Sequence, residues 1–158
     1  MTLTVGERAP DFELKNQHGQ FVRLSALLDH DPVVLVFLPL AFSATCTVEV
    51  STLQRQKQRF VDAGLTLVII SVDSTATLRA WAETGSHNLE FLSDFWPHGA
   101  TARAFGVLHE DKGFAVRATF LIDRSGIIRS VFEAPLGEIR DFSDYERAIS
   151  LTQLAEWS

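Results

Sequence analysis

The chain has 158 residues, of which 46% are hydrophobic and 22% charged, an ordinary globular balance that allows one domain with a full hydrophobic core. Its 14 lysines and arginines against 20 aspartates and glutamates give a net charge of -6, and this acidic balance argues against nucleic acid as a partner. The longest apolar run, residues 33–42, is about half as long as a membrane span, so no membrane association is expected.

The N-terminal part of the chain shows no targeting pattern and one predicted hairpin. Residues 1–12 ("MTLTVGERAPDF") lack the basic and then apolar segments of a signal peptide, so we expect a cytoplasmic location. Residues 11–14 and 21–24 both alternate apolar with polar side chains, which predicts a short antiparallel hairpin. Residues 33–38 ("VVLVFL") are continuously apolar and half of them are β-branched, as is typical of a strand buried on both faces.

A helix is predicted over residues 45–63, directly after this strand. Its apolar residues recur at helical spacing and so share one face; they are Cys46, Val50, Leu53 and Phe60. The segment "QRQKQR" fills the remaining, solvated faces. Gly64 is expected to end the helix, because glycine readily adopts the left-handed conformation that follows a helix.

The rest of the chain continues the strand–helix alternation and then changes it. Further elements are predicted at residues 65–71 (strand), 75–84 (helix, capped by Ser74), 90–93 (strand), 99–106 (helix), 117–123 and 127–132 (strands joined by a tight turn) and 143–156 (helix). The alternation predicts a parallel core, and the late strand pair adds antiparallel strands. We therefore expect an α/β protein with a thioredoxin-like fold: a mixed central sheet flanked by helices, with an N-terminal β-hairpin, in a single domain over residues 1–158.

Cys46 is the only cysteine, so the chain cannot form an internal disulfide. A helix start offers unpaired backbone N–H groups and the positive end of the dipole, and both favour a thiolate over a thiol. An ordinary cysteine has a pKa of about 8.5, and lowering such a value to roughly 6.5 takes about 2.7 kcal/mol. A helix terminus supplies about 0.3–1 kcal/mol, whereas a hydrogen bond from a charged donor supplies about 1.5–3 kcal/mol. We therefore expect a cation beside Cys46.

A lone cysteine is more often a small buried hydrophobe than a nucleophile. Here the position of Cys46 favours a reactive role, because thioredoxin-type proteins carry a C-x-x-C motif at this strand–helix junction. In this chain Ser43 stands where the first of those two cysteines would be. A hydroxyl cannot close a disulfide, but it can hydrogen-bond to an oxygen atom. The spacing therefore points away from dithiol exchange and toward an oxygen-containing substrate.

The segment "PLAFSATC" (residues 39–46) matches the P-x-x-x-[TS]-x-x-C signature of the peroxiredoxins, thiol peroxidases built on a thioredoxin-like core. Residues 9–25 resemble the N-terminal hairpin of that family, residues 92–99 ("LSDFWPHG") its middle segment, and residues 117–129 ("RATFLIDRSGIIR") its arginine-bearing strand pair. Having "PLAFS", "DFWPHG" and no second cysteine, the chain most resembles the one-cysteine, alkyl hydroperoxide reductase E type. It departs from the usual pattern in having Ser43 in place of threonine, and so lacks the methyl group that restricts the rotamer.

The resemblance implies a role for each residue of the site. Cys46 would be the peroxidatic nucleophile, which attacks a peroxide oxygen and becomes a sulfenic acid. Arg117 would hold both the thiolate and the peroxide with its fork of donors. Ser43 would bind the peroxide through its hydroxyl, and Pro39 would cover the thiol without adding a competing N–H. The supporting residues would be Thr45, through its backbone N–H, and Glu49 and Arg140, which would orient the arginine.

The same resemblance implies a hydroperoxide substrate and an external reducing thiol or redoxin. That reductant would be thioredoxin-like, or a low-molecular-weight thiol together with a redoxin. No cofactor is expected, and the sequence shows no metal-ligand spacing, phosphate loop or dinucleotide fingerprint. A homodimer or a higher oligomer is expected, with Phe42, Phe95 and Trp96 either at the interface or in the core. A peroxide sensor or a redox-controlled holdase that uses the same cysteine is the alternative function.

Overall fold

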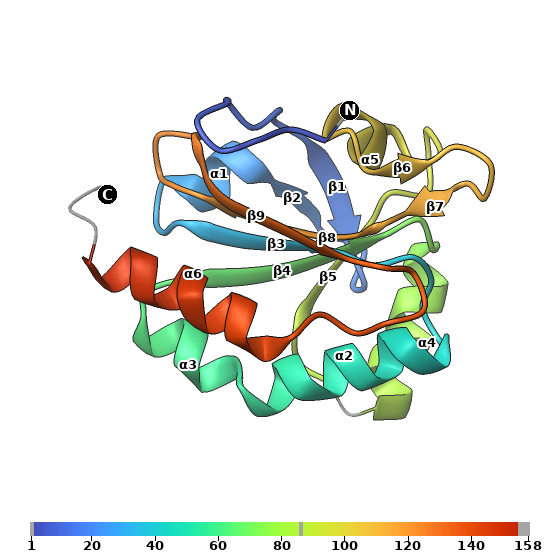
Figure 1. Ribbon diagram of the computed structural model, residues 1–158. Coiled ribbons are helices and arrows are strands. Elements are labelled where there is room, and N and C mark those ends of the chain that lie inside the picture. Colours follow the sequence, from blue (N-terminus) through green and yellow to red (C-terminus); the bar gives the residue numbers. More distant parts are fainter. Residues whose placement is uncertain (1, 86, 155–158) are drawn as a thin grey trace.

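A computed structural model describes residues 2–85 and 87–154, and its centre is a seven-stranded mixed sheet (Figure 1). The strands of that sheet lie in the order β2-β1-β5-β4-β3-β8-β9. Their bounds are β1 Glu13–Asn16, β2 Phe21–Arg23, β3 Val33–Phe37, β4 Thr66–Ser71, β5 Glu90–Ser93, β8 Arg117–Ile122 and β9 Ile128–Ala134. Strands β3, β4 and β5 pair in parallel, and the remaining pairs are antiparallel. The expected thioredoxin-like α/β fold, with its N-terminal hairpin, is confirmed.

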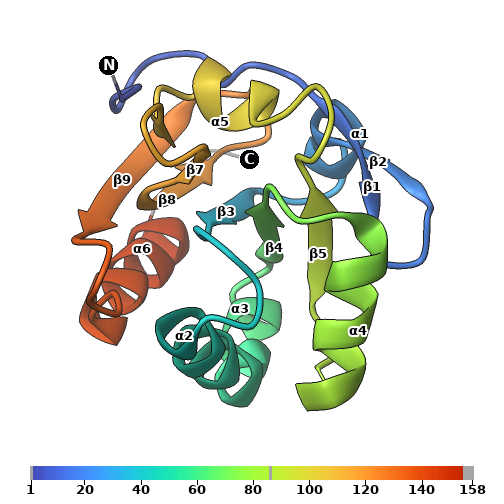
Figure 2. The same cartoon turned by 90° about the vertical axis from the view of Figure 1, so that its right-hand side faces the viewer.

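Helices cover both faces of the sheet, as Figures 1 and 2 show. On one face lie α2 (Ala44–Arg55), α3 (Lys57–Asp62), α4 (Thr75–Gly85) and α6 (Phe142–Leu154). On the other lie α1 (Leu24–Leu28) and α5 (Ala100–Ala104), together with a small separate hairpin of β6 (Leu108–His109) and β7 (Phe114–Ala115). Because both faces are covered, the central strands are buried on both sides.

The side chains of β3 show how one strand serves two hydrophobic cores. Val34 and Val36 pack in the core beneath α2, α3, α4 and α6, whereas Val33, Leu35 and Phe37 pack in the core beneath α1 and α5. Successive side chains of a strand point to opposite faces, so a strand between two helix layers needs an uninterrupted apolar run. Each of these fully buried side chains contributes about 1.5–3 kcal/mol relative to an exposed one.

The predicted helix over residues 45–63 is in fact two helices. The break falls at Gln56, whose φ of -98° and ψ of 7° lie outside the α-helical region. No glycine or proline marks this break, and the buried face predicted from the apolar spacing continues across it to Phe60. Gly64, with a φ of 73°, follows the second helix as expected.

Other differences from the predicted elements are small. Helix α1, with five residues, and the β6–β7 hairpin, with two residues in each strand, were not predicted. Strands of two residues are too short to show a periodicity. The predicted C-terminal helix begins within one residue of the observed one, and its last two predicted residues lie outside the described part of the chain. Within the described residues, no helix is long and apolar enough to span a bilayer.

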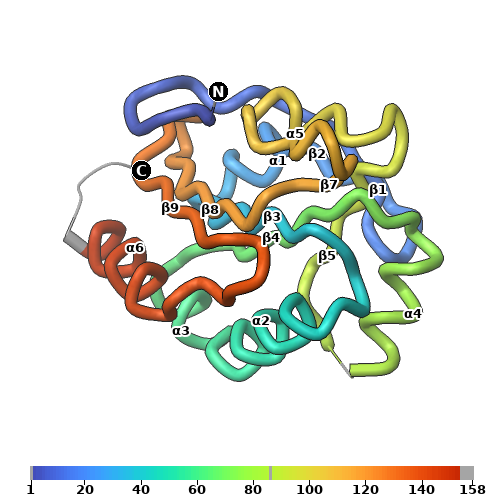
Figure 3. Tube along the Cα trace, turned by 45° about the vertical axis from the view of Figure 1, so that its right-hand side comes forward, coloured from blue at the N-terminus to red at the C-terminus, as the bar shows by residue number. Residues whose placement is uncertain are grey.

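Strand pairing places the cysteine and the arginine at the same edge of the sheet. Strand β3 leads through a short loop into α2, and β8 pairs antiparallel with β3, with Val36 opposite Thr119. Arg117 begins β8 and therefore lies beside the loop that follows β3. Figure 3 shows the connection from β9 to α6 passing beside the N-terminal half of α2. The loop after β3, the start of β8 and the connection from β9 to α6 therefore all meet at the start of α2.

Candidate active site

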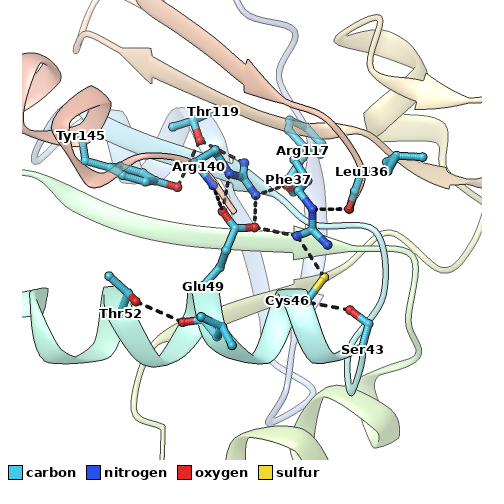
Figure 4. Close-up of polar contacts among 11 residues, drawn as sticks. Phe37, Ser43, Cys46, Glu49, Thr52, Arg117, Thr119, Leu136, Arg140 and Tyr145 are labelled. Carbon is cyan, nitrogen blue, oxygen red and sulfur yellow. Dashed lines mark hydrogen bonds and ion pairs between the residues drawn. The ribbon is translucent and has the colours of Figure 1, made fainter. Parts of the chain in front are cut away.

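Cys46 lies in the first turn of α2, and Ser43 caps that helix (Figure 4). The Ser43 hydroxyl oxygen accepts a hydrogen bond from the Cys46 backbone N–H at 3.3 Å. A hydroxyl also carries one hydrogen and a second lone pair, so capping the helix leaves Ser43 able to donate to another group. Cys46 is 0% exposed, which means that the protein itself excludes water from the thiol.

Arg117 supplies the cation that the sequence led us to expect beside the thiol. Its Nη1 donates to Cys46 Sγ at 3.4 Å and to a Glu49 oxygen at 2.6 Å, and its Nε donates to the Leu136 carbonyl at 2.8 Å. The second terminal nitrogen, Nη2, has no hydrogen-bond partner among the described residues. The guanidinium is therefore fixed on one side and keeps donors for a further ligand.

Glu49, three residues after the cysteine on α2, holds the two arginines together. Its carboxylate accepts four hydrogen bonds: from Arg117 Nη1 and Arg140 Nη2 on one oxygen, and from Arg140 N and Nε on the other. These four bonds use the full acceptor capacity of the group. Burial raises the pKa of Glu49, but the hydrogen bonds and charges of Arg140 and Arg117 outweigh it and lower that pKa below its ordinary value.

Arg140 is buried at the centre of this network, although the sequence indicated only a supporting role. Besides its bonds to Glu49, it donates to the Thr119 hydroxyl at 3.1 Å and to the Phe37 carbonyl at 2.9 Å. The Thr119 hydroxyl in turn lies 3.3 Å from the Tyr145 hydroxyl. Burial raises the pKa of Tyr145, so its phenol stays neutral. Arg140 thus joins β3, β8 and α2 around the charged side chains, and Thr119 extends this network to α6 (Figure 4).

Sequence reasoning missed Thr119 and Tyr145. One signal was present for Thr119, because residues two apart in a strand share a face and it follows Arg117 at that interval. Nothing in the sequence links Tyr145 to the site, since its contact depends on how α6 packs.

The loop between β3 and α2 carries the remaining predicted residues. Pro39 is buried in this loop, and Thr45 is half-buried and forms no side-chain hydrogen bond within the described residues. Phe42 adopts a φ of 67°, a left-handed conformation that is costly for a bulky residue, by about 1–3 kcal/mol. The strain at Phe42 indicates that the surrounding structure enforces the shape of this loop. The roles assigned to Pro39, Ser43 and Thr45 in binding peroxide stay predictions.

Three aromatic residues near this edge of the sheet point to solvent. Phe42 and Phe95 are each 52% exposed and Trp96 is 79% exposed, so none of them belongs to the core. Phe42 lies in the loop after β3, and the other two lie in the loop after β5. Elsewhere in the described residues, no group of three or more histidine, cysteine, aspartate or glutamate side chains is arranged to hold a metal ion.

Comparison with known proteins identifies the family. Residues 5–131 match the model of the AhpC/TSA family. The chain is 42% identical over 139 residues to alkyl hydroperoxide reductase E of Mycobacterium tuberculosis, covering 88% of this chain and 91% of that one. It is 31% identical to the chloroplast 2-Cys peroxiredoxin BAS1 of Spinacia oleracea, covering 94% of this chain and 59% of that one.

Solved structures give the same result. The crystal structure of peroxidoxin BcpB from Mycobacterium tuberculosis superposes with a TM-score of 0.83 at 29% identity, covering 96% of this chain and 97% of that one. The reduced 2-Cys peroxiredoxin of Plasmodium vivax superposes with a TM-score of 0.86 at 28% identity, covering 96% of this chain and 82% of that one. The chain therefore belongs to the AhpC/TSA family, as a one-cysteine peroxiredoxin similar to alkyl hydroperoxide reductase E.

Proposed function

We propose that this protein is a thiol-dependent peroxidase that reduces hydrogen peroxide and organic hydroperoxides through a sulfenic acid on Cys46. The observation that supports this most strongly is the Arg117 Nη1 at 3.4 Å from the buried sulfur, held there by Glu49 at 2.6 Å. A guanidinium in a dry site favours the thiolate, which is the nucleophilic form of cysteine.

In the oxidation step, the Cys46 thiolate attacks one oxygen of the peroxide. A sulfur–oxygen bond forms as the oxygen–oxygen bond breaks, and the leaving oxygen takes up a proton and departs as water or an alcohol. Two donors at the site have no acceptor among the described residues and can hold the peroxide: the Arg117 Nη2 and the Ser43 hydroxyl hydrogen. Donors that are fixed before the reaction stabilise charge on the leaving oxygen without having to reorganise.

Recycling needs two thiols from outside the chain, because no second cysteine is present. The first attacks the sulfenic acid, forming a mixed disulfide and releasing water. The second attacks that disulfide, releasing Cys46 and leaving the two external thiols joined. We propose a thioredoxin-like protein, or a low-molecular-weight thiol with a redoxin, as the reductant. Such thiols are kept reduced in the cytoplasm, in line with the location expected from the N-terminal sequence.

Turnover with a panel of thiols separates the peroxidase from a sensor or holdase. Trp81 provides the signal, since its Nε1 donates at 3.3 Å to the hydroxyl of Thr47, the residue after the cysteine. A peroxidase should show a rapid fluorescence change with hydrogen peroxide, recovery on adding reductant, and consumption of many equivalents of peroxide. Oxidation that stops after one equivalent with every thiol and redoxin tested would contradict the proposal and support a sensor.

We also propose that the protein forms a homodimer through the exposed Phe42, Phe95 and Trp96. The loops that carry them follow the parallel strands β3 and β5, so both lie at the same edge of the sheet. Exposed aromatic clusters are typical of interfaces. Light scattering should show Trp96→Glu as a monomer, whereas Val61→Glu, a change at an exposed residue of α3, should leave the dimer intact. A monomeric parent protein would contradict this assembly.

A further inference from the structure

Within the described residues, a single hydrogen bond ties the loop segment 39–42, which carries Pro39 and leads to Ser43, to a neighbouring element. The Leu38 N–H makes the last bond to β4, donating to the Ile70 carbonyl at 2.9 Å, and proline has no N–H to offer. Beyond that point, the Ala41 N–H donates to Asp73 Oδ2 at 2.7 Å. Within residues 2–85 and 87–154, no other hydrogen bond joins residues 39–42 to a neighbouring element.

Asp73 is itself fixed to the ends of two strands. Ser71, the last residue of β4, donates its hydroxyl to the same Oδ2 at 2.7 Å. Ser93, the last residue of β5, donates its hydroxyl to the Asp73 carbonyl at 2.6 Å. Both serines are buried. Asp73 itself lies in the loop between β4 and α4, and these bonds tie both its carboxylate and its backbone to the ends of two strands of the sheet.

The strained residue lies between this anchor and the helix cap. Phe42, with its φ of 67°, directly follows Ala41 and directly precedes Ser43. A bulky residue persists in this conformation only where its neighbours impose it. The Ala41–Asp73 bond holds the chain before Phe42, and the Ser43 cap holds it after. Without the carboxylate, the loop would be free to relax and to carry the Ser43 hydroxyl and Pro39 with it.

We propose that Asp73 is a positioning residue for peroxide reduction, which fixes the loop so that Ser43 and Pro39 meet the peroxide beside Cys46. This proposal rests on the proposed function. Among the described residues, no hydrogen bond joins Asp73 to Cys46, Arg117 or Glu49. Its loss should therefore slow the reaction with peroxide while leaving the thiolate as stable as before.

The test compares Asp73→Ala with Asp73→Asn in two measurements: the rate constant for oxidation of Cys46 by hydrogen peroxide, and the pH titration of thiolate absorbance. Asp73→Ala should lower the rate constant by about 10- to 100-fold, since a misplacement of about 1 Å can have an effect of that size. The titration should not move. Asp73→Asn should recover most of the rate, because an amide oxygen still accepts the Ala41 N–H.

Asp11→Ala is the matched control. The Asp11 carboxylate also accepts a backbone N–H, from Ser25 at 2.9 Å, but it does so at the start of α1, on the other face of the sheet from α2. This variant should keep the parent rate. A double-mutant cycle adds Ser43→Ala: if Asp73 acts through Ser43, the rate losses of the two alanine variants should not be additive.

Several outcomes would overturn the assignment of Asp73. These are a parent-like rate in Asp73→Ala, an Asp73→Asn variant as slow as the alanine variant, additive losses in the cycle, or a displaced thiolate titration. Each requires that the parent protein reacts with peroxide. A parent protein that does not react would instead overturn the proposed function, so the two failures are distinguishable.

Discussion

The Cys46→Ser variant is expected to consume no peroxide with any reducing thiol. Serine keeps the size and the helix position of the residue, but its hydroxyl does not ionise at neutral pH and is a weak nucleophile. The chain has no other cysteine that could take over the reaction. Peroxide consumption measured with the full panel of reductants checks this expectation, and thermal unfolding shows whether the variant is folded.

Measurable turnover by folded Cys46→Ser protein would remove the basis for a cysteine-based mechanism. Cys46 is 0% exposed, and replacing its sulfur by oxygen removes little volume. A loss of turnover can therefore be assigned to the missing thiol rather than to a change in packing. A large shift in unfolding temperature would indicate a packing effect instead, and Cys46→Ala then serves as the second variant.

The Arg117→Ala variant should oxidise more slowly by a factor on the order of 10² to 10³. Removing one donor that stabilises charge in a transition state has an effect of that size. The same change removes the only positive side chain that hydrogen-bonds to the sulfur within the described residues, so the midpoint of the thiolate titration should move to higher pH. Stopped-flow fluorescence measures the first effect, and thiolate absorbance measures the second.

Two further variants show which property of Arg117 matters. Arg117→Lys keeps the charge but loses the planar fork, and should fall between the parent and the alanine variant. Arg79→Ala removes the same charge from an exposed residue of α4 that pairs with Glu83, and should behave as the parent protein does. If Arg117→Ala leaves both the rate and the titration unchanged, another group must hold the thiolate.

Much of this fold can be read from the sequence, because its central strands are apolar without interruption. Strand β3, the parallel strand after it and the late strand pair all lie within about two residues of their predicted ranges. Cys46 and Arg117 were predicted for different reasons. The role of Cys46 follows from its position at a strand–helix junction. The role of Arg117 needed two arguments: the helix dipole alone supplies too little free energy to stabilise a thiolate, and the family resemblance points to this arginine as the missing cation.

Other features depend on packing that leaves no local pattern. Arg140 bonds with Glu49, 91 residues away in the chain, and neither residue type indicates burial by itself. Asp73 lies in an ordinary polar stretch, and its importance is visible only once the structure shows that, among the described residues, nothing else hydrogen-bonds segment 39–42 to a neighbouring element. Long-range contacts between polar side chains are therefore where sequence reasoning was weakest in this protein.

The charges around the sulfur have a consequence for the second half of the catalytic cycle. Two guanidinium groups face a single carboxylate, so a thiolate on Cys46 would bring the cluster to electroneutrality. A protonated sulfenic acid carries no charge, and its formation leaves one positive charge unbalanced in a medium where attraction is stronger than in water. The thiolate of the external reductant would meet this unbalanced positive charge beside the Cys46 sulfur, which is the atom that it attacks. The arginines that favour attack of Cys46 on peroxide therefore also favour the external thiolate that reduces the sulfenic acid.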